Sequence, residues 1–190
     1  MAMSLSAALL SAAVVLGACG IAQSAKDTSE DPSSQVVVGH STPSEQYDSV
    51  DSAIRASDGV ILGSVVAVAP GRSVIAGGIT MPFTNVTLRV MESSVGAIPV
   101  NSTIVIEQTG GQTPRGVLVG EDDPLYQTNE VDVLILRKID IGYRSIAPLG
   151  RFRVQGGQLQ PTAPTSIART WSGRSPGDLM SSAKQLQAGK

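Results

Sequence analysis

Residues 59–69 read GVILGSVVAVA, and this stretch decides the fold class of the 190-residue chain. It is rich in β-branched residues and apolar at consecutive positions, which is typical of a strand that is covered on both faces of a sheet. Gly63 interrupts the stretch, and a glycine inside a strand predicts a bend or a bulge. The sequence therefore predicts a central β-strand here, followed by a turn at Pro70-Gly71.

Further β-type segments follow this strand, separated by turns that contain glycine or proline. Residues 84–91 alternate apolar and polar side chains, as a half-buried strand does. One short helix, capped by Ser49, is predicted before the central strand. The remaining strand candidates are Thr103–Gln108, Val131–Leu136, Gly142–Ala147, and a hairpin of Arg151–Val154 with Leu159. Five to six strands with few helices predict an all-β domain, and closure into a small barrel would hide the edges of the sheet.

The order of these strands also resembles a known domain. From DGVILGSVVAV (58–68), through FTNVTLRVMES, NSTIVIEQTGG and EDDPLYQTNEVDVLILRK, to YRSIAPLGRFRVQGGQL (143–159), the chain resembles a domain of unknown function that recurs in secreted bacterial proteins. That domain is similar to the barrel of netrin modules and tissue metalloprotease inhibitors. The resemblance implies a small OB-like Greek-key barrel with short flanking helices. Those inhibitors use disulfides and an N-terminal cysteine, which this domain lacks, so metalloprotease inhibition does not carry over.

The first nineteen residues point to export. Residues 5–19, LSAALLSAAVVLGAC, form an apolar run that is shorter than a membrane-spanning helix and fits the core of a signal peptide, although no Lys or Arg precedes it. The run ends in Leu16-Gly17-Ala18-Cys19, which resembles the lipobox of bacterial lipoproteins. The resemblance implies cleavage between Ala18 and Cys19, a diacylglycerol on the Cys19 thiol, and acylation, typically by palmitate, of the new amino terminus. The alternative for this lone cysteine is a buried free thiol.

The predicted domain organisation follows from these features. The segment after Cys19 is rich in Ser, Thr and Pro, which favours a flexible spacer, although Val36–Val38 could pair with a strand. His40, the sole histidine, lies in this spacer, where we expect it to be solvated. Near the C-terminus, Asp178 is the predicted cap of a short amphipathic helix. The predicted parts are a signal peptide (1–18), a lipidated N-terminus and tether (19–48), an OB-like β-barrel domain (49–162) and a C-terminal extension (163–190).

No catalytic set emerges from the sequence. Gly173–Gly177 reads GRSPG and fits the G-x-S-x-G pattern of a nucleophile elbow, but Pro176 has no N–H to offer an oxyanion hole, so a turn is the better interpretation. A single cysteine and a single histidine argue against disulfides and against zinc or haem sites. The long polar loop 112–129 carries Glu121–Asp123, which could bind a calcium ion, but without EF-hand spacing a solvated loop is favoured. We therefore expect no catalytic residue, no metal and no cofactor.

The charge is unevenly distributed, although the formal net charge is only −2. Residues 129–174 hold seven basic residues against three acidic ones, which predicts a basic surface. A nucleic-acid site would also need aromatic platforms, and of the nearby aromatic residues Phe152 is predicted to point into the core. We expect anionic envelope polymers or lipid headgroups as partners, and no nucleic acid. The candidates for surface binding are Arg137, Arg144, Arg151 and Arg153.

These features predict an exported, lipid-anchored protein on the extracytoplasmic side of the cell membrane. It would act as a non-catalytic binding or assembly module, in contact with the membrane through Cys19 and with an unidentified envelope component. Two alternatives remain open. One is a carrier that holds an apolar ligand inside the barrel. The other is a lipid-anchored hydrolase whose acidic site would bring together Glu107, Glu121, Asp123 and Glu130.

Overall fold

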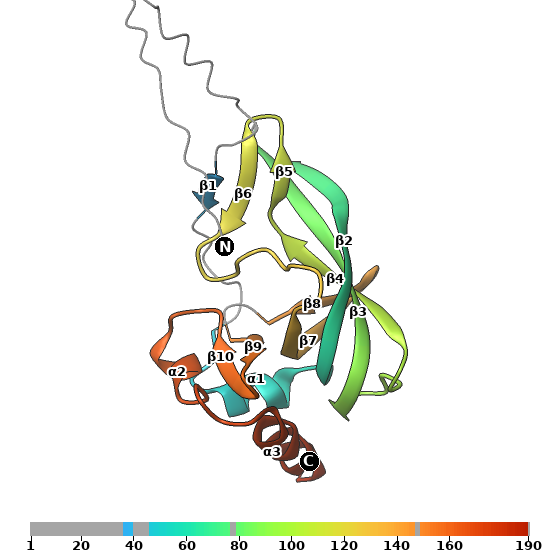
Figure 1. The fold of residues 1–190 in the computed structure, drawn as a ribbon, viewed down its shortest axis with the longest axis vertical. Coiled ribbons are helices and arrows are strands. Elements are labelled where there is room, and N and C mark those ends of the chain that lie inside the picture. Colours follow the sequence, from blue (N-terminus) through green and yellow to red (C-terminus); the bar gives the residue numbers. More distant parts are fainter. Residues whose placement is uncertain (1–35, 40–45, 77–78, 147–148, 190) are drawn as a thin grey trace, which may run out of the picture. The chain divides into compact units, whose positions relative to one another are not determined.

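The predicted central strand is the first part of β2 (Gly59–Ala76), which pairs with β3 (Ile79–Val95) and with β7 (Val131–Ile139). The computed structural model describes residues 36–39, 46–76, 79–146 and 149–189 (Figure 1). The register between β2 and β3 shifts next to Gly63, which confirms the predicted irregularity. The turn predicted at Pro70-Gly71 is wrong, because the strand continues to Ala76. Another of the register shifts follows Pro70, where an irregular ladder tolerates a residue that has no N–H to donate.

Seven strands form one sheet, in the order β10-β9-β7-β2-β3-β4-β8. Strand β8 pairs in parallel with β4 and antiparallel with β7, so the pairings run in a circuit from β7 through β2, β3, β4 and β8 back to β7. The contact between β4 and β8 is a single registered pair, Ile106 with Tyr143, and the sheet is therefore not a clearly closed barrel. The remaining bounds are β4 (Thr103–Thr109), β8 (Gly142–Ser145), β9 (Arg151–Gln155) and β10 (Gln158–Pro161).

A second, three-stranded sheet has the order β1-β6-β5. Strand β1 (Val36–Gly39) runs parallel to β6 (Gly116–Gly120), so the valine triplet does pair with a strand. Strands β5 (Gly111–Thr113) and β6 occupy part of the segment that was predicted as a long polar loop, and that prediction is wrong there. These strands have three and five residues, too few to show a clear hydrophobic period.

The all-β class is therefore confirmed, but the predicted strand count is too low. The described residues form ten strands in two sheets, where the sequence predicts five to six strands. Three short helices accompany them: α1 (Val50–Ala56), α2 (Ser166–Arg169) and α3 (Pro176–Ala188). Among the described residues, no helix has both the length and the apolar character needed to span a membrane.

The helix starts explain two sequence motifs. Ser49 caps α1 as predicted, and forms a capping box with Ser52. The cap of α3 is Ser175 and not Asp178, which is the third helical residue. The two form a capping box, in which the Asp178 backbone N–H donates to the Ser175 hydroxyl and the Ser175 backbone N–H donates to the Asp178 carboxylate. The G-x-S-x-G match at residues 173–177 thus contains a helix start, with Pro176 at the first helical position, where its missing N–H costs nothing.

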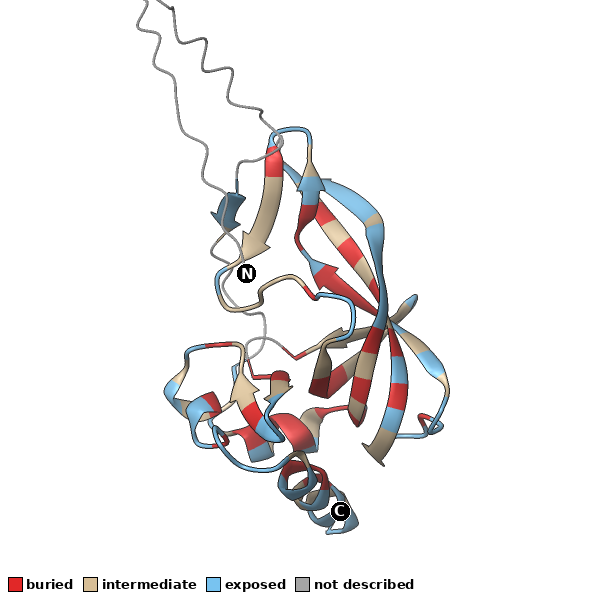
Figure 2. Cartoon of the chain, in the orientation of Figure 1, coloured by how far each residue is buried: buried red, intermediate tan, exposed pale blue. Residues whose placement is uncertain are grey.

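Two apolar clusters pack on opposite faces of the main sheet. Figure 2 marks the buried residues along the strands and helices in red. Alternate residues of β7 separate between them: Val133 and Ile135 belong to the first cluster, and Leu134 and Leu136 to the second. All three helices contribute to the first cluster, which includes Phe152 as predicted. The helices therefore cover one face of the sheet, and this packing places the groove described next.

Candidate functional site

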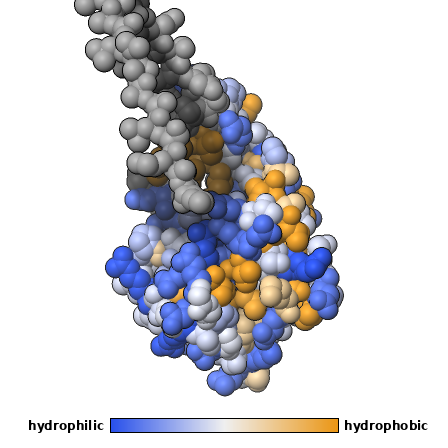
Figure 3. All heavy atoms as spheres, in the orientation of Figure 1, coloured by the Kyte–Doolittle hydropathy of each residue, from blue (hydrophilic) through white to orange (hydrophobic). Residues whose placement is uncertain are grey.

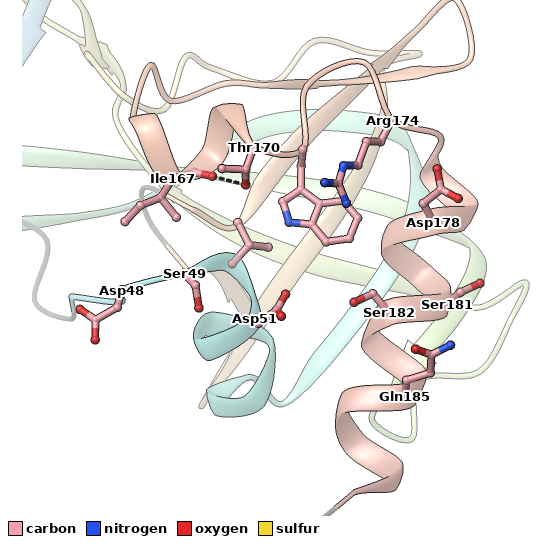
Figure 4. Close-up of a pocket in the computed structure, with 12 residues that line it drawn as sticks. Asp48, Ser49, Asp51, Ile167, Thr170, Arg174, Asp178, Ser181, Ser182 and Gln185 are labelled. Carbon is pink, nitrogen blue, oxygen red and sulfur yellow. Dashed lines mark hydrogen bonds between the residues drawn. The ribbon is translucent and has the colours of Figure 1, made fainter.

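A groove with a volume of about 800 Å³ lies among the three helices (Figure 4). Asp48 and Asp51 come from the beginning of α1 and the residues just before it. Arg174 comes from the segment between α2 and α3, and Ser182 and Gln185 come from α3 itself. In Figure 4, Asp51 on α1 lies opposite Ser182 on α3 and Arg174 lies above them, whereas Asp48 lies at the edge of the groove.

The amphipathic pattern of α3 explains why its polar residues line the groove. Leu179, Met180 and Ala183 are at most 1% exposed and pack in the first cluster. Residues spaced by three and four positions share one face of a helix, so Ser181 and Gln185 fall outside this apolar face. Ser182, three positions after Leu179, lies at its border. On the side of the molecule drawn in Figure 3, hydrophilic residues predominate over the end that carries α2 and α3.

Trp171 lines the groove and also belongs to the apolar core. Its side chain is 7% exposed and belongs to the first cluster, and the guanidinium of Arg174 lies 4.6 Å from the centroid of its ring. Its indole N–H forms no hydrogen bond with the part of the chain that the structure describes. Trp171 lines the groove, so this donor is available to a ligand there.

Several other polar side chains of the groove form no hydrogen bond or ion pair with a described residue. The carboxylates of Asp48 and Asp51 form no hydrogen bond or ion pair with any described residue. The carboxylate of Asp178 differs, because it accepts a hydrogen bond from the backbone N–H of Ser175 at 3.1 Å. The further side chains of the groove without a described polar partner are Ser181, Ser182 and Gln185.

Two clusters of charged groups elsewhere in the body are paired, and the first surrounds Arg151. Its Nη1 lies 3.2 Å from Asp123 Oδ1, its Nη2 lies 2.7 Å from Glu130 Oε2, and its Nε lies 3.5 Å from Asp132 Oδ2. Its guanidinium also lies over the ring of Tyr126, 3.5 Å from the centroid. The side chain of Arg151 is only 2% exposed, so its predicted role as a surface-binding residue is wrong.

The tertiary structure explains why the prediction for Arg151 is wrong. Alternation along β9 predicts that Arg151 points away from the core, opposite to Phe152. The segment before β7, which carries Asp123 and Glu130, then covers the arginine and supplies its partners. Burial raises the pKa of Asp132 to about 6 even though Arg151 lies beside it, and burial likewise raises the pKa of Asp123.

A second paired cluster surrounds Glu107, whose side chain is 1% exposed. Its carboxylate accepts hydrogen bonds from Arg72 Nε at 2.7 Å and from Arg144 Nη2 at 2.6 Å. The hydrogen bond from Arg72 is the main cause that holds the pKa of Glu107 below its usual range. Both guanidiniums also flank the ring of Phe83, at 4.9 Å for Arg72 and 5.7 Å for Arg144.

The four arginines predicted as a binding surface therefore have different partners. Arg144 pairs with Glu107, and Arg151 and Arg153 share Glu130. Arg137 donates a hydrogen bond to the hydroxyl of Tyr47 at 3.0 Å. The side chain of Arg144 is 43% exposed, which is more than the 28% of Arg153 and the 2% of Arg151.

The four carboxylates proposed for an acidic site are also divided. Glu107 belongs to the cluster with Arg72 and Arg144, whereas Asp123 and Glu130 contact Arg151. Glu121 is exposed. Within the described ranges, no group of three or more His, Cys, Asp or Glu residues is arranged to hold a metal ion. The predicted lipidation and cleavage positions, Cys19 and Ala18, lie outside the described residues.

Sequence reasoning missed the groove. Its lining comes from residues 48–51, 167–174 and 178–185, and none of these segments carries a recognisable motif. The available clue was Trp171, the only tryptophan of the chain, close to Arg174 and to an amphipathic helix. Comparisons of the chain with protein-family models, curated proteins and solved structures give no match.

Proposed function

We propose that this chain is an exported, lipid-anchored protein of the cell envelope whose body binds an envelope component without catalysing a reaction. The observation that carries the binding role is the groove among α1, α2 and α3. The carboxylates of Asp48 and Asp51 in this groove have no described partners, whereas the buried carboxylates of the body are paired with arginines. The hydroxyls of Ser181 and Ser182 and the amide of Gln185 also lack described partners. Polar groups of a concave surface that form no hydrogen bond within the protein can bind a ligand and fix its orientation.

The paired carboxylates support a non-catalytic role. A general acid or base must reach the proton of a bound substrate. The carboxylate of Glu107 forms ion pairs with Arg72 and Arg144. The carboxylates of Asp123 and Glu130 form ion pairs with Arg151. The acidic-hydrolase alternative receives no support from this arrangement.

We infer that the main sheet is an incompletely closed OB-like barrel. The circuit of pairings through β7, β2, β3, β4 and β8 supports this assignment, as does the parallel contact between β4 and β8. The second apolar cluster lies on the side of the sheet enclosed by the circuit, and its buried side chains include Ile61, Leu88 and Ile106, each at most 1% exposed. Side chains buried against one another there favour a binding surface on the outside over a carrier of an apolar ligand.

Replacement of the predicted lipid-bearing residue tests the anchoring. We expect Cys19→Ala to move the protein from the membrane fraction to the soluble extracytoplasmic fraction, because alanine has no thiol to accept a diacylglycerol. Each buried methylene of such a chain contributes about 0.8 kcal/mol to membrane binding, so its loss should release nearly all of the protein. Fractionation followed by immunoblotting measures the distribution. Ser24→Ala is the matched control and should stay in the membrane fraction; retention of Cys19→Ala there would rule out the lipid anchor.

A further inference from the structure

We propose that the groove among α1, α2 and α3 binds a saccharide, that is, an uncharged ligand dense in hydroxyl groups. The inference rests on the proposed binding function and adds the chemical class of the ligand. It is drawn from the hydrogen-bonding groups that the groove leaves unpaired and from the position of Trp171 among them.

The unpaired groups of the groove include both donors and acceptors. Asp48 and Asp51 can only accept hydrogen bonds, whereas the indole N–H of Trp171 and the guanidinium of Arg174 can only donate. Serine hydroxyls and the glutamine amide can do both. A ligand that satisfies this mixture must itself alternate donors and acceptors over short distances, as the hydroxyls of a sugar do. The side chains of the groove that can both donate and accept are Ser181, Ser182 and Gln185.

Trp171 supplies the observation that is independent of the charged residues. Its side chain is more than nine-tenths buried, yet its N–H has no described hydrogen-bond partner. The guanidinium of Arg174 already covers one face of the ring. Because Trp171 lines the groove, an oxygen acceptor of a ligand bound there would form a hydrogen bond with this N–H.

A cationic ligand is the main competitor, because the groove carries three aspartates against one arginine. Two observations favour the saccharide. The carboxylate of Asp178 is already engaged at the start of α3, and the guanidinium of Arg174 places a positive charge inside the groove. A cation would also leave the N–H of Trp171 without an acceptor, whereas a hydroxyl group satisfies donors and acceptors alike.

Trp171 is the sole tryptophan and lines the groove, so its fluorescence is a direct readout of binding there. The full chain, in a detergent without a sugar headgroup, is titrated with the uncharged tetrasaccharides of glucose, N-acetylglucosamine and mannose. We expect at least one to give a saturable change in tryptophan emission. Calorimetric titration serves as the second readout and detects binding that leaves the emission unchanged.

Two variants localise the binding. We expect Asp51→Asn to weaken the binding about tenfold or more, because it removes a charged acceptor from the ligand's hydrogen bonds. Asp140→Asn is the matched control, since Asp140 is also exposed but lies in the turn between β7 and β8, and should leave the affinity unchanged. Both variants should keep the unfolding temperature of the parent chain.

Three results would overturn the inference: no binding of any tetrasaccharide in either readout, equal effects of both variants, or saturable binding of spermidine in place of the sugars. Binding of spermidine that disappears at high salt would assign the groove to a cation. None of these results would by itself contradict the proposed binding of an envelope component. That binding is tested separately, by cross-linking from the groove in the cell envelope, so failure of the saccharide inference can be distinguished from failure of the proposed function.

Discussion

Replacement of Arg151 by methionine should lower the free energy of unfolding by about 3–5 kcal/mol. The side chain is 2% exposed and contacts three carboxylates, those of Asp123, Glu130 and Asp132. Methionine roughly keeps the apolar volume but leaves these carboxylates without their cation in a buried environment. Removal of one partner from a buried charge cluster costs much more than replacement of the whole cluster by apolar residues. Urea unfolding of the purified chain measures the loss.

Arg153→Met is the matched control for this experiment. Arg153 pairs with the same Glu130, but its side chain is 28% exposed, so water screens the pair. We expect a loss of about 1 kcal/mol or less. Similar losses in the two variants, or a loss below about 1 kcal/mol for Arg151→Met, would contradict the view that Arg151 holds the segment before β7 against the sheet.

Replacement of Leu179 by alanine should cost a similar amount, about 3–5 kcal/mol. Leu179 is 0% exposed and packs in the first cluster, which also contains Phe152 and Trp171. The truncation removes apolar contacts and leaves a cavity between α3 and the sheet. Because α3 forms one wall of the groove, the tryptophan emission should also shift towards that of a more exposed indole. Denaturant unfolding followed by this emission measures both effects.

Leu186→Ala provides the comparison within the same helix. Leu186 is only partly buried against the first cluster, so the same chemical change should cost about 1–2 kcal/mol. If Leu179→Ala unfolds no more easily than Leu186→Ala, then α3 does not pack on the sheet as described, and the groove loses one of its walls.

The sequence predicts the main strands well because each of them carries its own local pattern. The consecutive apolar residues at the start of β2 identify more than half of that strand, and the alternation in β3 identifies nearly half of it. Strands β5 and β6 lack such a pattern: they are short, flanked by glycines, and acquire their partners only in the folded chain. The turn at Pro70-Gly71 fails for a related reason, because the long ladder between β2 and β3 overrides a local turn preference.

The functional residues were harder to predict because charge pairing is a tertiary property. Arg151 has the sequence pattern of an exposed strand residue, and only the covering segment with Asp123 and Glu130 turns it into a buried charge. The groove is assembled from three separate segments, so no single spacing reveals it. Ser175 and Pro176 show the opposite case, since a capping box explains their residue types without any catalytic role.

The central claim is that the groove among α1, α2 and α3 contacts an envelope component, and photo-cross-linking in living cells tests it most directly. A photoreactive amino acid replaces Ser181 in the groove or, as the control, Gln155 in the exposed end of β9. After irradiation, immunoblotting detects covalent adducts of the full chain in the envelope fraction. We predict a discrete adduct of higher mass from position 181 and none from position 155. The absence of an adduct from position 181, or the same adducts from both positions, would contradict the claim.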